Sequence, residues 1–167
     1  MGTGYLISLD TLVTAGHCVH DPNYGAATSI HCFIGYRGPL VQEGRQHCTA
    51  RAVIAPSAWV INRDVQQDFG VVRLSRSFEG AVNILPLQIY AALSSFPSGA
   101  TIGVVGYPGA GPMNYNHRGL EKGAKMYKAF VEVGEPSVKI EEGRLKYKIT
   151  TYRGELFYAV YIFVLAD

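Results

Sequence analysis

Short apolar runs alternate along the chain with clusters of glycine, proline, asparagine and aspartate, and this spacing favours β-strands. Tyrosine, valine and isoleucine, which suit a half-buried pleated surface, are frequent in the runs. Residues Lys146–Ile149 alternate with period two, as expected of a strand with one wet face. Helical periodicity is nearly absent, with one turn at most at Ala91–Ser95. The predicted strands are Gly4–Ser8, Thr11–Ala15, Ser29–Gly35, Thr49–Ile54, Gly70–Leu74, Thr101–Gly106, Ala129–Val133, Leu145–Thr151 and Ala159–Val164.

A stretch rich in helix- and strand-breaking residues predicts a division of the chain into two halves. Pro86, Pro97 and Gly99 interrupt regular structure there. We therefore expect a first β domain over residues 1–90 and a second over residues 98–167. Many short strands at even spacing are typical of a β-sandwich or of paired barrels, so the predicted fold class is all-β.

The composition is that of a folded globular protein, with 48% hydrophobic and 17% charged residues among 167. A net charge of +2 is too small to indicate a nucleic acid or an anionic membrane as partner. The most apolar stretch, Leu156–Ala166, is too short to span a bilayer. The opening residues Met1–Ile7 resemble a strand and lack the basic start and cleavage site of a signal peptide.

The segment Leu12–Cys18 carries the most chemical information in the chain. An apolar β-branched run ends at Ala15-Gly16, and His17 follows at once with Cys18 beside it. A histidine at the end of a rigid strand can be held within hydrogen-bond reach of a reacting group, which a general base requires. We therefore single out His17 as a candidate base.

A carboxylate that could orient this histidine precedes a buried-looking strand. Asp68 is followed directly by the apolar run Gly70–Leu74, whereas no apolar strand follows Asp64, its competitor. An aspartate beside a catalytic imidazole accepts its N–H and stabilises the imidazolium. Two further elements follow in order, the turn Gly106–Gly109 and the segment Thr150–Glu155.

Together these motifs resemble the chymotrypsin-like serine endopeptidases, and most closely their glutamyl endopeptidase branch. The resemblance covers residues 2–155 and implies two Greek-key β-barrels, the first without its opening strand and the second incomplete. It implies that His17 is the general base and Asp68 its partner. It also implies that Gly154 supplies an oxyanion-hole N–H, together with the amide of residue 156, and that Thr151 lines the substrate pocket.

The family pattern fails at the nucleophile. After Thr151 the family places Gly-x-Ser-Gly-Ser-Pro-Val, but Gly154-Glu155 is followed here by Leu156 and Phe157. Leucine has no nucleophilic atom, and phenylalanine cannot take the positive φ of glycine without strain. We therefore predict that this chain is inactive. The terminal stretch Leu156–Asp167 has two possible origins that the sequence leaves open, a splice or reading-frame boundary and a nucleophile loop that drifted in place.

The chain has three cysteines, Cys18, Cys32 and Cys48, so one has no partner if two pair. Cys32 and Cys48 lie in the same predicted hairpin and are the disulfide candidate, but a fully reduced set is equally compatible with the sequence. Each cysteine follows a histidine, which raises the question of zinc. Neighbouring strand residues point to opposite faces, and no zinc-type spacing is present, so we expect no metal and no cofactor.

Three functions therefore follow from the sequence. The first is a serine-type endopeptidase homologue, with cleavage after glutamate as the implied specificity, that has lost its activity. The second is a pseudoprotease that binds a peptide or a protein partner, and the third is a small structural metal-binding β protein. The expected partner is a peptide or protein, and unpaired strand edges predict self-association. The family resemblance implies secretion, although this chain shows no signal peptide of its own.

Overall fold

The computed structural model describes residues 2–38, 43–80, 84, 101–107, 126–132, 138–141, 144–147 and 159–163. Its largest element is a five-stranded antiparallel sheet with the order β1-β2-β7-β6-β5. These strands are β1 (Tyr5–Ser8), β2 (Thr11–Thr14), β5 (His31–Ile34), β6 (Gln46–Ile54) and β7 (Gly70–Leu74). Within the described residues the sheet is open, because β1 and β5 are each bonded to one neighbour.

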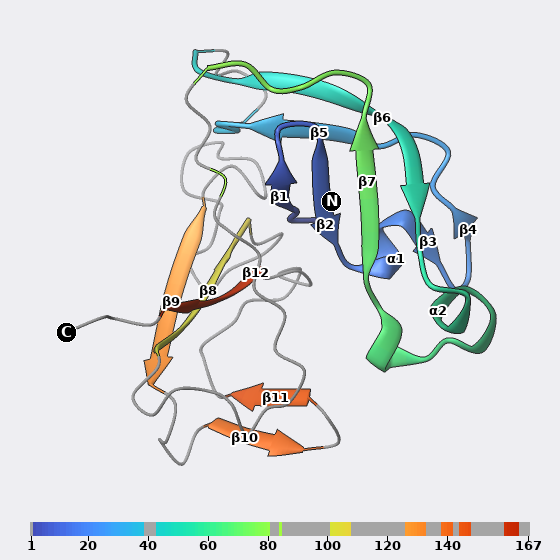
Figure 1. Ribbon diagram of the computed structural model, residues 1–167, viewed down its shortest axis with the longest axis vertical. Helices are drawn as coiled ribbons and strands as arrows, with labels where there is room; N and C mark the ends of the chain where they lie inside the picture. Colours follow the sequence, from blue (N-terminus) through green and yellow to red (C-terminus); the bar gives the residue numbers. More distant parts are fainter. Residues whose placement is uncertain are drawn as a thin grey trace.

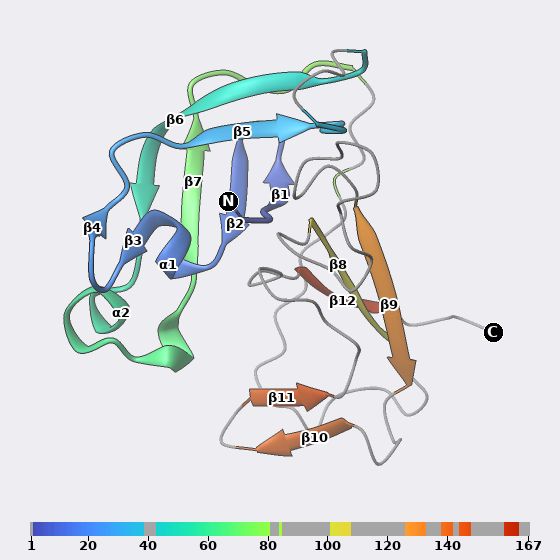
Figure 2. The same ribbon diagram turned by 180° about the vertical axis from the view of Figure 1, so that it is seen from behind.

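The remaining strands form three smaller sheets. One has the order β12-β8-β9, and the others are the pairs β10-β11 and β3-β4. Their bounds are β3 (His20–Asp21), β4 (Gly25–Ala26), β8 (Thr101–Gly106), β9 (Tyr127–Glu132), β10 (Val138–Glu141), β11 (Arg144–Tyr147) and β12 (Ala159–Phe163). The five-stranded sheet lies to one side and the β12-β8-β9 sheet to the other, as both views show (Figures 1 and 2).

Three short helical segments complete the described structure: α1 (Gly16–Val19), α2 (Ser57–Asn62) and the 3-10 helix η1 (Val65–Gln67). Helices α1 and α2 lie near the end of the large sheet where β2 ends and β7 begins (Figure 1). No helix in the described part of the chain is long and apolar enough to cross a membrane.

The pairing of β2 with β7 places the core on one face of the large sheet. Leu12 lies opposite Val72, and Thr14 lies opposite Gly70. Alternate residues of β7 point inward, so Gly70, Val72 and Leu74 are buried. The buried apolar cluster is Leu12, Val19, Cys48, Val72, Leu74 and Phe78.

Strand β6 gives the sheet its curl. Its first half pairs with β5, and its second half pairs with β7 through a register shift between Ala50 and Ala52. A bulge of this kind bends a strand and increases its twist, and β6 curves visibly in Figure 1. This double pairing explains why β6 begins at Gln46, three residues before the start that the apolar pattern predicts at Thr49.

The predicted and observed strands agree well where a single apolar run forms a strand with one continuous pairing. The runs Gly70–Leu74 and Thr101–Gly106 match β7 and β8 to the residue. The helical segments α1, α2 and η1 and the strands β3, β4 and β10 were not predicted. The predicted domain boundary and the turn at Ala91–Ser95 lie outside the described residues.

Candidate active site

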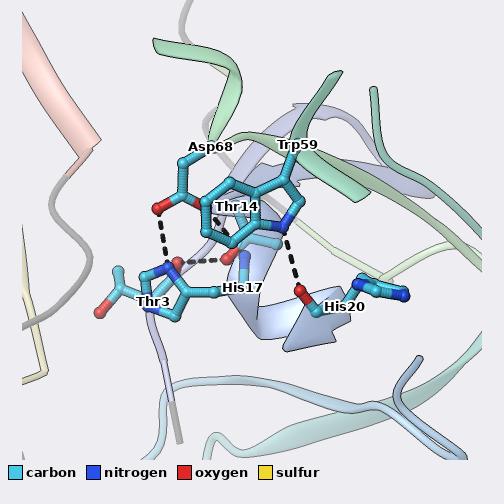
Figure 3. A network of polar contacts seen from close by, with 6 residues as sticks. All are labelled: Thr3, Thr14, His17, His20, Trp59 and Asp68. Carbon is cyan, nitrogen blue, oxygen red and sulfur yellow. Dashed lines mark hydrogen bonds and ion pairs between the residues drawn. The ribbon is translucent and has the colours of Figure 1, made fainter. Parts of the chain in front are cut away.

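The structure brings together His17 and Asp68, which are far apart in the sequence (Figure 3). The Nδ1 atom of His17 lies 2.8 Å from Oδ2 of Asp68. The backbone N–H of His17 donates to the other carboxylate oxygen, Oδ1, at 2.9 Å. Asp68 therefore holds both the ring and the main chain of the same residue, which fixes the imidazole in position and in orientation.

Strand register explains why these two residues meet. Thr14, the last residue of β2, pairs with Gly70, the first residue of β7. His17 follows Thr14 by one tight turn in α1, and Asp68 lies just ahead of Gly70. Both side chains therefore emerge at the same end of the β2–β7 pair.

The contact determines which nitrogen of the ring carries the proton. An ionised carboxylate can only accept hydrogen bonds, so Nδ1 of His17 must be the donor to Asp68. In the neutral ring Nε2 then has the lone pair and can accept a proton. Both side chains are about three-quarters buried, with 23% of His17 and 25% of Asp68 exposed. The arrangement can therefore act as a general base whose imidazolium form is stabilised by an adjacent carboxylate.

Asp64, the alternative partner in the sequence, has a structural position instead. Its side chain accepts a hydrogen bond from the backbone N–H of Gln66 at 2.9 Å, which caps the 3-10 helix η1. The cap fixes the turn from which Asp68 emerges. The two aspartates therefore lie at opposite ends of η1 and make different contacts.

Helix α1 fits against the site only because residue 16 is glycine. A Cβ atom at Gly16 would lie 2.7 Å from Cδ1 of Trp59 and 3.0 Å from Oδ1 of Asp68. The first distance is shorter than real Cβ contacts allow. Glycine therefore permits the close approach of the His17 backbone to both the indole and the carboxylate.

Trp59 forms a wall of the site that the sequence analysis did not identify. Its side chain is 6% exposed, and its ring centroid lies 6.2 Å from that of His17 at a tilt of 53°. The indole N–H donates to the backbone oxygen of His20 at 3.0 Å, at the far end of α1 (Figure 3). Trp59 therefore fixes both ends of the short helix that presents His17. The signal available in the sequence was that this is the single tryptophan of the chain.

A threonine near the start of the chain connects this site with β8. Thr14 donates its hydroxyl to the backbone oxygen of Thr3 at 2.9 Å. The hydroxyl of Thr3 in turn accepts the backbone N–H of Tyr107 at 3.0 Å. Tyr107 is partly buried, and burial raises the pKa of its phenol. Through Thr3, the residue that directly follows β8 is tied to the strand that leads to His17.

Several residues predicted for the site lie outside the described residues. These are Thr151, Gly154 and Leu156, together with Pro108 and Gly109 of the predicted turn. Of the sequence-predicted catalytic residues, the structure thus places His17 and Asp68.

The three cysteines are free thiols in this structure. Cys18 lies next to His17 in α1, whereas Cys32 and Cys48 lie on β5 and β6, away from the His17–Asp68 pair. Burial raises the pKa of the Cys18 thiol, a shift that a hydrogen bond with Thr14 partly offsets. The predicted disulfide partners, Cys32 and Cys48, lie directly opposite each other on β5 and β6.

The remaining histidine–cysteine pairs do not converge on one point. His31 and His47 hydrogen-bond each other, with 2.9 Å between Nδ1 and Nε2, on the exposed face of the hairpin. Cys48 is buried on the opposite face. Among the described residues, no group of three or more histidine, cysteine, aspartate or glutamate side chains could hold a metal ion.

An all-β fold that presents a histidine–aspartate pair at the end of a strand pair has the arrangement that the base and acid take in triad hydrolases. The sequence model of the Trypsin family matches residues 1–125. The chain therefore belongs to the trypsin family, and its fold is the trypsin-like all-β fold.

Two curated relatives are similar to the chain in sequence. The chain is 30% identical over 106 residues to a protein named extracellular metalloprotease from Bacillus subtilis, which is 64% of this chain and 33% of that protein. It is 26% identical over 156 residues to glutamyl endopeptidase from Bacillus licheniformis, which is 92% of this chain and 42% of that protein. The chain thus spans about a third of the length of the first relative and less than half of the length of the second.

Solved structures share the fold. A Glu endopeptidase in complex with MPD superposes with a TM-score of 0.72 at 22% identity, over 95% of this chain and 67% of that one. The protease Anisep from Arthrobacter nicotinovorans superposes with a TM-score of 0.70 at 19% identity, over 99% of this chain and 72% of that one.

Proposed function

We propose that this chain is a serine endopeptidase homologue of the glutamyl endopeptidase type that keeps the base and acid of a catalytic triad and lacks the nucleophile. The observation that carries this proposal is the double contact of Asp68 with the ring and backbone of His17. One named relative supports it, since it is a glutamyl endopeptidase. The proposed partner is a peptide or a protein, and the proposed location is outside the cell.

In an active member of such a family, the reaction is acyl transfer from a peptide to a serine hydroxyl and then to water. Nε2 of His17 would take the proton of the attacking hydroxyl and later give it to the leaving amine. Asp68 would hold Nδ1 protonated throughout and stabilise the imidazolium that forms between these steps. Gly154 would donate a backbone N–H to the oxyanion, and Thr151 would line the substrate pocket.

Leu156 occupies the nucleophile position in the sequence motif, so the first of these steps has no hydroxyl to deprotonate. Loss of the nucleophile from a triad leaves roughly 10³–10⁴-fold residual catalysis, which comes from binding and the oxyanion hole. Phe157 in place of glycine would also disturb the oxyanion loop. We therefore expect binding without turnover.

The test has two arms, one for the orienting pair and one for the lost activity. A proton held between Nδ1 and a carboxylate gives a far-downfield proton resonance, which we expect from His17 in the intact chain. Asp68→Asn should abolish this resonance, because an amide can donate to Nδ1 and favour the other tautomer. Asp64→Asn is the matched control from the same loop and should leave the resonance unchanged, since Asp64 contacts Gln66 and not His17.

In the second arm, the purified chain is incubated with a chromogenic glutamyl ester and with a fluorophosphonate that labels activated serines. We expect neither a burst of product nor labelling. A burst would refute the proposed inactivity but leave the orienting pair intact. A resonance that survives Asp68→Asn would refute the pair itself, whatever the activity.

A further inference from the structure

A pair of thiols lies on the hairpin of β5 and β6, on the side that faces the core. Cys32 pairs directly with Cys48 in the strand register. The flanking residues His31 and Phe33 are exposed, whereas Cys48 is 2% exposed, so strand alternation directs both sulfurs to the inner face. Strands β5 and β6 lie side by side in both ribbon views (Figures 1 and 2).

The backbone geometry of this pair suits a covalent link. The backbone N–H of Ala50 donates to the oxygen of Ile30 at 2.9 Å, which marks these residues as a hydrogen-bonded pair. Hydrogen-bonded and non-hydrogen-bonded pairs alternate along an antiparallel ladder, so Cys32 and Cys48 also form a hydrogen-bonded pair. Such pairs have Cα atoms about 5.5 Å apart, which lies within the range that disulfides span. Their Cβ atoms are farther apart than in non-hydrogen-bonded pairs, so a closed bridge here is strained and easily reduced again.

The electrostatics of Cys32 agree with this proximity of the two cysteines. Burial raises the pKa of the Cys32 thiol to about 11, and the negative charge of a Cys48 thiolate adds to the rise. Cys48 belongs to the core cluster with Leu12 and Val72, and Cys32 packs against that cluster from its edge. The pair is therefore partly shielded, with Cys32 as its accessible member.

We propose that Cys32 and Cys48 are a redox modification site that closes reversibly into a cross-strand disulfide by exchange with a low-molecular-weight disulfide such as oxidised glutathione. The site is separate from the His17–Asp68 pair. Cys18 remains a thiol, because it lies in α1 and not opposite either of the other cysteines.

The exchange proceeds in two balanced steps. The thiolate of Cys32 attacks one sulfur of oxidised glutathione, the glutathione S–S bond breaks, and one glutathione thiolate leaves and takes a proton. The thiolate of Cys48 then attacks the Cys32 sulfur and expels the second glutathione, which also takes a proton. The two protein thiols are oxidised to one disulfide, and one oxidised glutathione is reduced to two glutathione molecules. The exposures set this order, since Cys48 is nearly inaccessible to a tripeptide.

Two consequences follow from the burial of the pair. Little thiolate exists near neutral pH, so the exchange rate should rise roughly tenfold per pH unit until the pH approaches the raised pKa. The closed disulfide ties β5, the end strand of the large sheet, to β6 and constrains the unfolded chain. The oxidised protein should therefore melt at a higher temperature than the reduced protein.

The experiment incubates the full chain with oxidised glutathione, blocks the remaining thiols and digests the protein with trypsin and Asp-N without reduction. Cleavage before Asp21 separates Cys18 from Cys32, and cleavage after Arg37 and Arg45 separates Cys32 from Cys48. We expect peptide 21–37 linked to peptide 46–51. The thiol count should fall from the three cysteines of the sequence to one.

The control variant is Cys18→Ser, which should form the same link at the same rate and gain thermal stability on oxidation. Cys32→Ser should form no intramolecular disulfide. A link through Cys18, a stable glutathione adduct at Cys32 or three thiols that persist at alkaline pH would each overturn the proposal. Because the Cys18→Ser variant retains both proposed partners, the test does not depend on the folding of Cys32→Ser.

Discussion

Strands β2 and β7 run antiparallel, and an aspartate precedes each of them, Asp10 before β2 and Asp68 before β7. At one end of the pair, Asp68 holds the ring and the backbone of His17. At the other end, Asp10 accepts the hydroxyls of Ser8 and Thr11 at 2.8 and 3.0 Å and pairs with Arg73 at 2.8 Å. The two carboxylates that precede these paired strands thus have different partners.

The surroundings of the two ends differ as much as the partners do. The two aspartates are about equally exposed, Asp10 at 28% and Asp68 at 25%, and the difference lies in their partners. Arg73 is 62% exposed, so its ion pair with Asp10 is largely screened by water. Asp68 and His17 are enclosed by α1 and by the buried indole of Trp59. A screened carboxylate bonded to hydroxyls and a guanidinium stabilises a turn. An enclosed carboxylate bonded to an imidazole holds a proton-transferring group in place, and this contrast can be tested by mutation.

The largest expected effect comes from removal of the wall at the enclosed end. Trp59→Ala leaves a cavity beside Gly16 and His17 and an unsatisfied oxygen on His20, and should lower the free energy of unfolding by about 3–5 kcal/mol. Urea denaturation followed by circular dichroism measures this loss. The matched variant at the other end of the β2–β7 pair is Arg73→Ala, which removes the exposed partner of Asp10 and should lower the free energy of unfolding far less. Equal losses for the two variants would contradict the contrast between the ends.

The next effect tests the close approach that glycine permits. Gly16→Ala should cost about 1–3 kcal/mol, because the new methyl group overlaps the indole of Trp59 and must displace it or α1. In the double variant with Trp59→Phe, the overlapping atoms of the five-membered ring are gone. The double variant should therefore lose less stability than the sum of the two single losses. Additive losses would show that the indole is not what excludes a side chain at residue 16.

The sequence was sufficient to predict the parts of this site that depend on strand pattern. The buried run Gly70–Leu74 forms β7 as expected, and the carboxylate directly ahead of it is the one that contacts His17. The pattern favoured Asp68 over Asp64 because an apolar strand follows Asp68 at once. In the structure Asp64 caps η1, a contact made within its own loop.

Tertiary contacts decide the parts that the sequence did not predict. Helices α1 and α2 are far shorter than a helix that is stable alone, so they contain too few residues to show a helical periodicity in the sequence. Trp59 stabilises α1 from a distant segment, and Gly16 is required only because that indole lies against it. Strand β10 could have been found, since Val138–Glu141 alternates apolar and charged residues.

The smallest expected effect concerns Asp10, just ahead of β2, and depends on pH. Hydrogen bonds from Ser8 and Thr11 and the charge of Arg73 lower the pKa of Asp10, so the folded state favours the ionised carboxylate. Its contribution to stability is then fully present above the pKa of an unfolded aspartate, about 3.9, and is lost as the pH falls through the lower folded-state value. Asp10→Asn should therefore destabilise the protein slightly near neutral pH and have no effect in strong acid.

Urea denaturation of Asp10→Asn and of the unmodified chain at a series of pH values measures this difference. A destabilisation that persists unchanged into strong acid would mean that the shape of the Ser8 and Thr11 contacts matters and the charge does not. Asp10 would then resemble Asp68, since both carboxylates would act through the geometry of their hydrogen bonds. The exposed ion pair with Arg73 would contribute little to the role of Asp10.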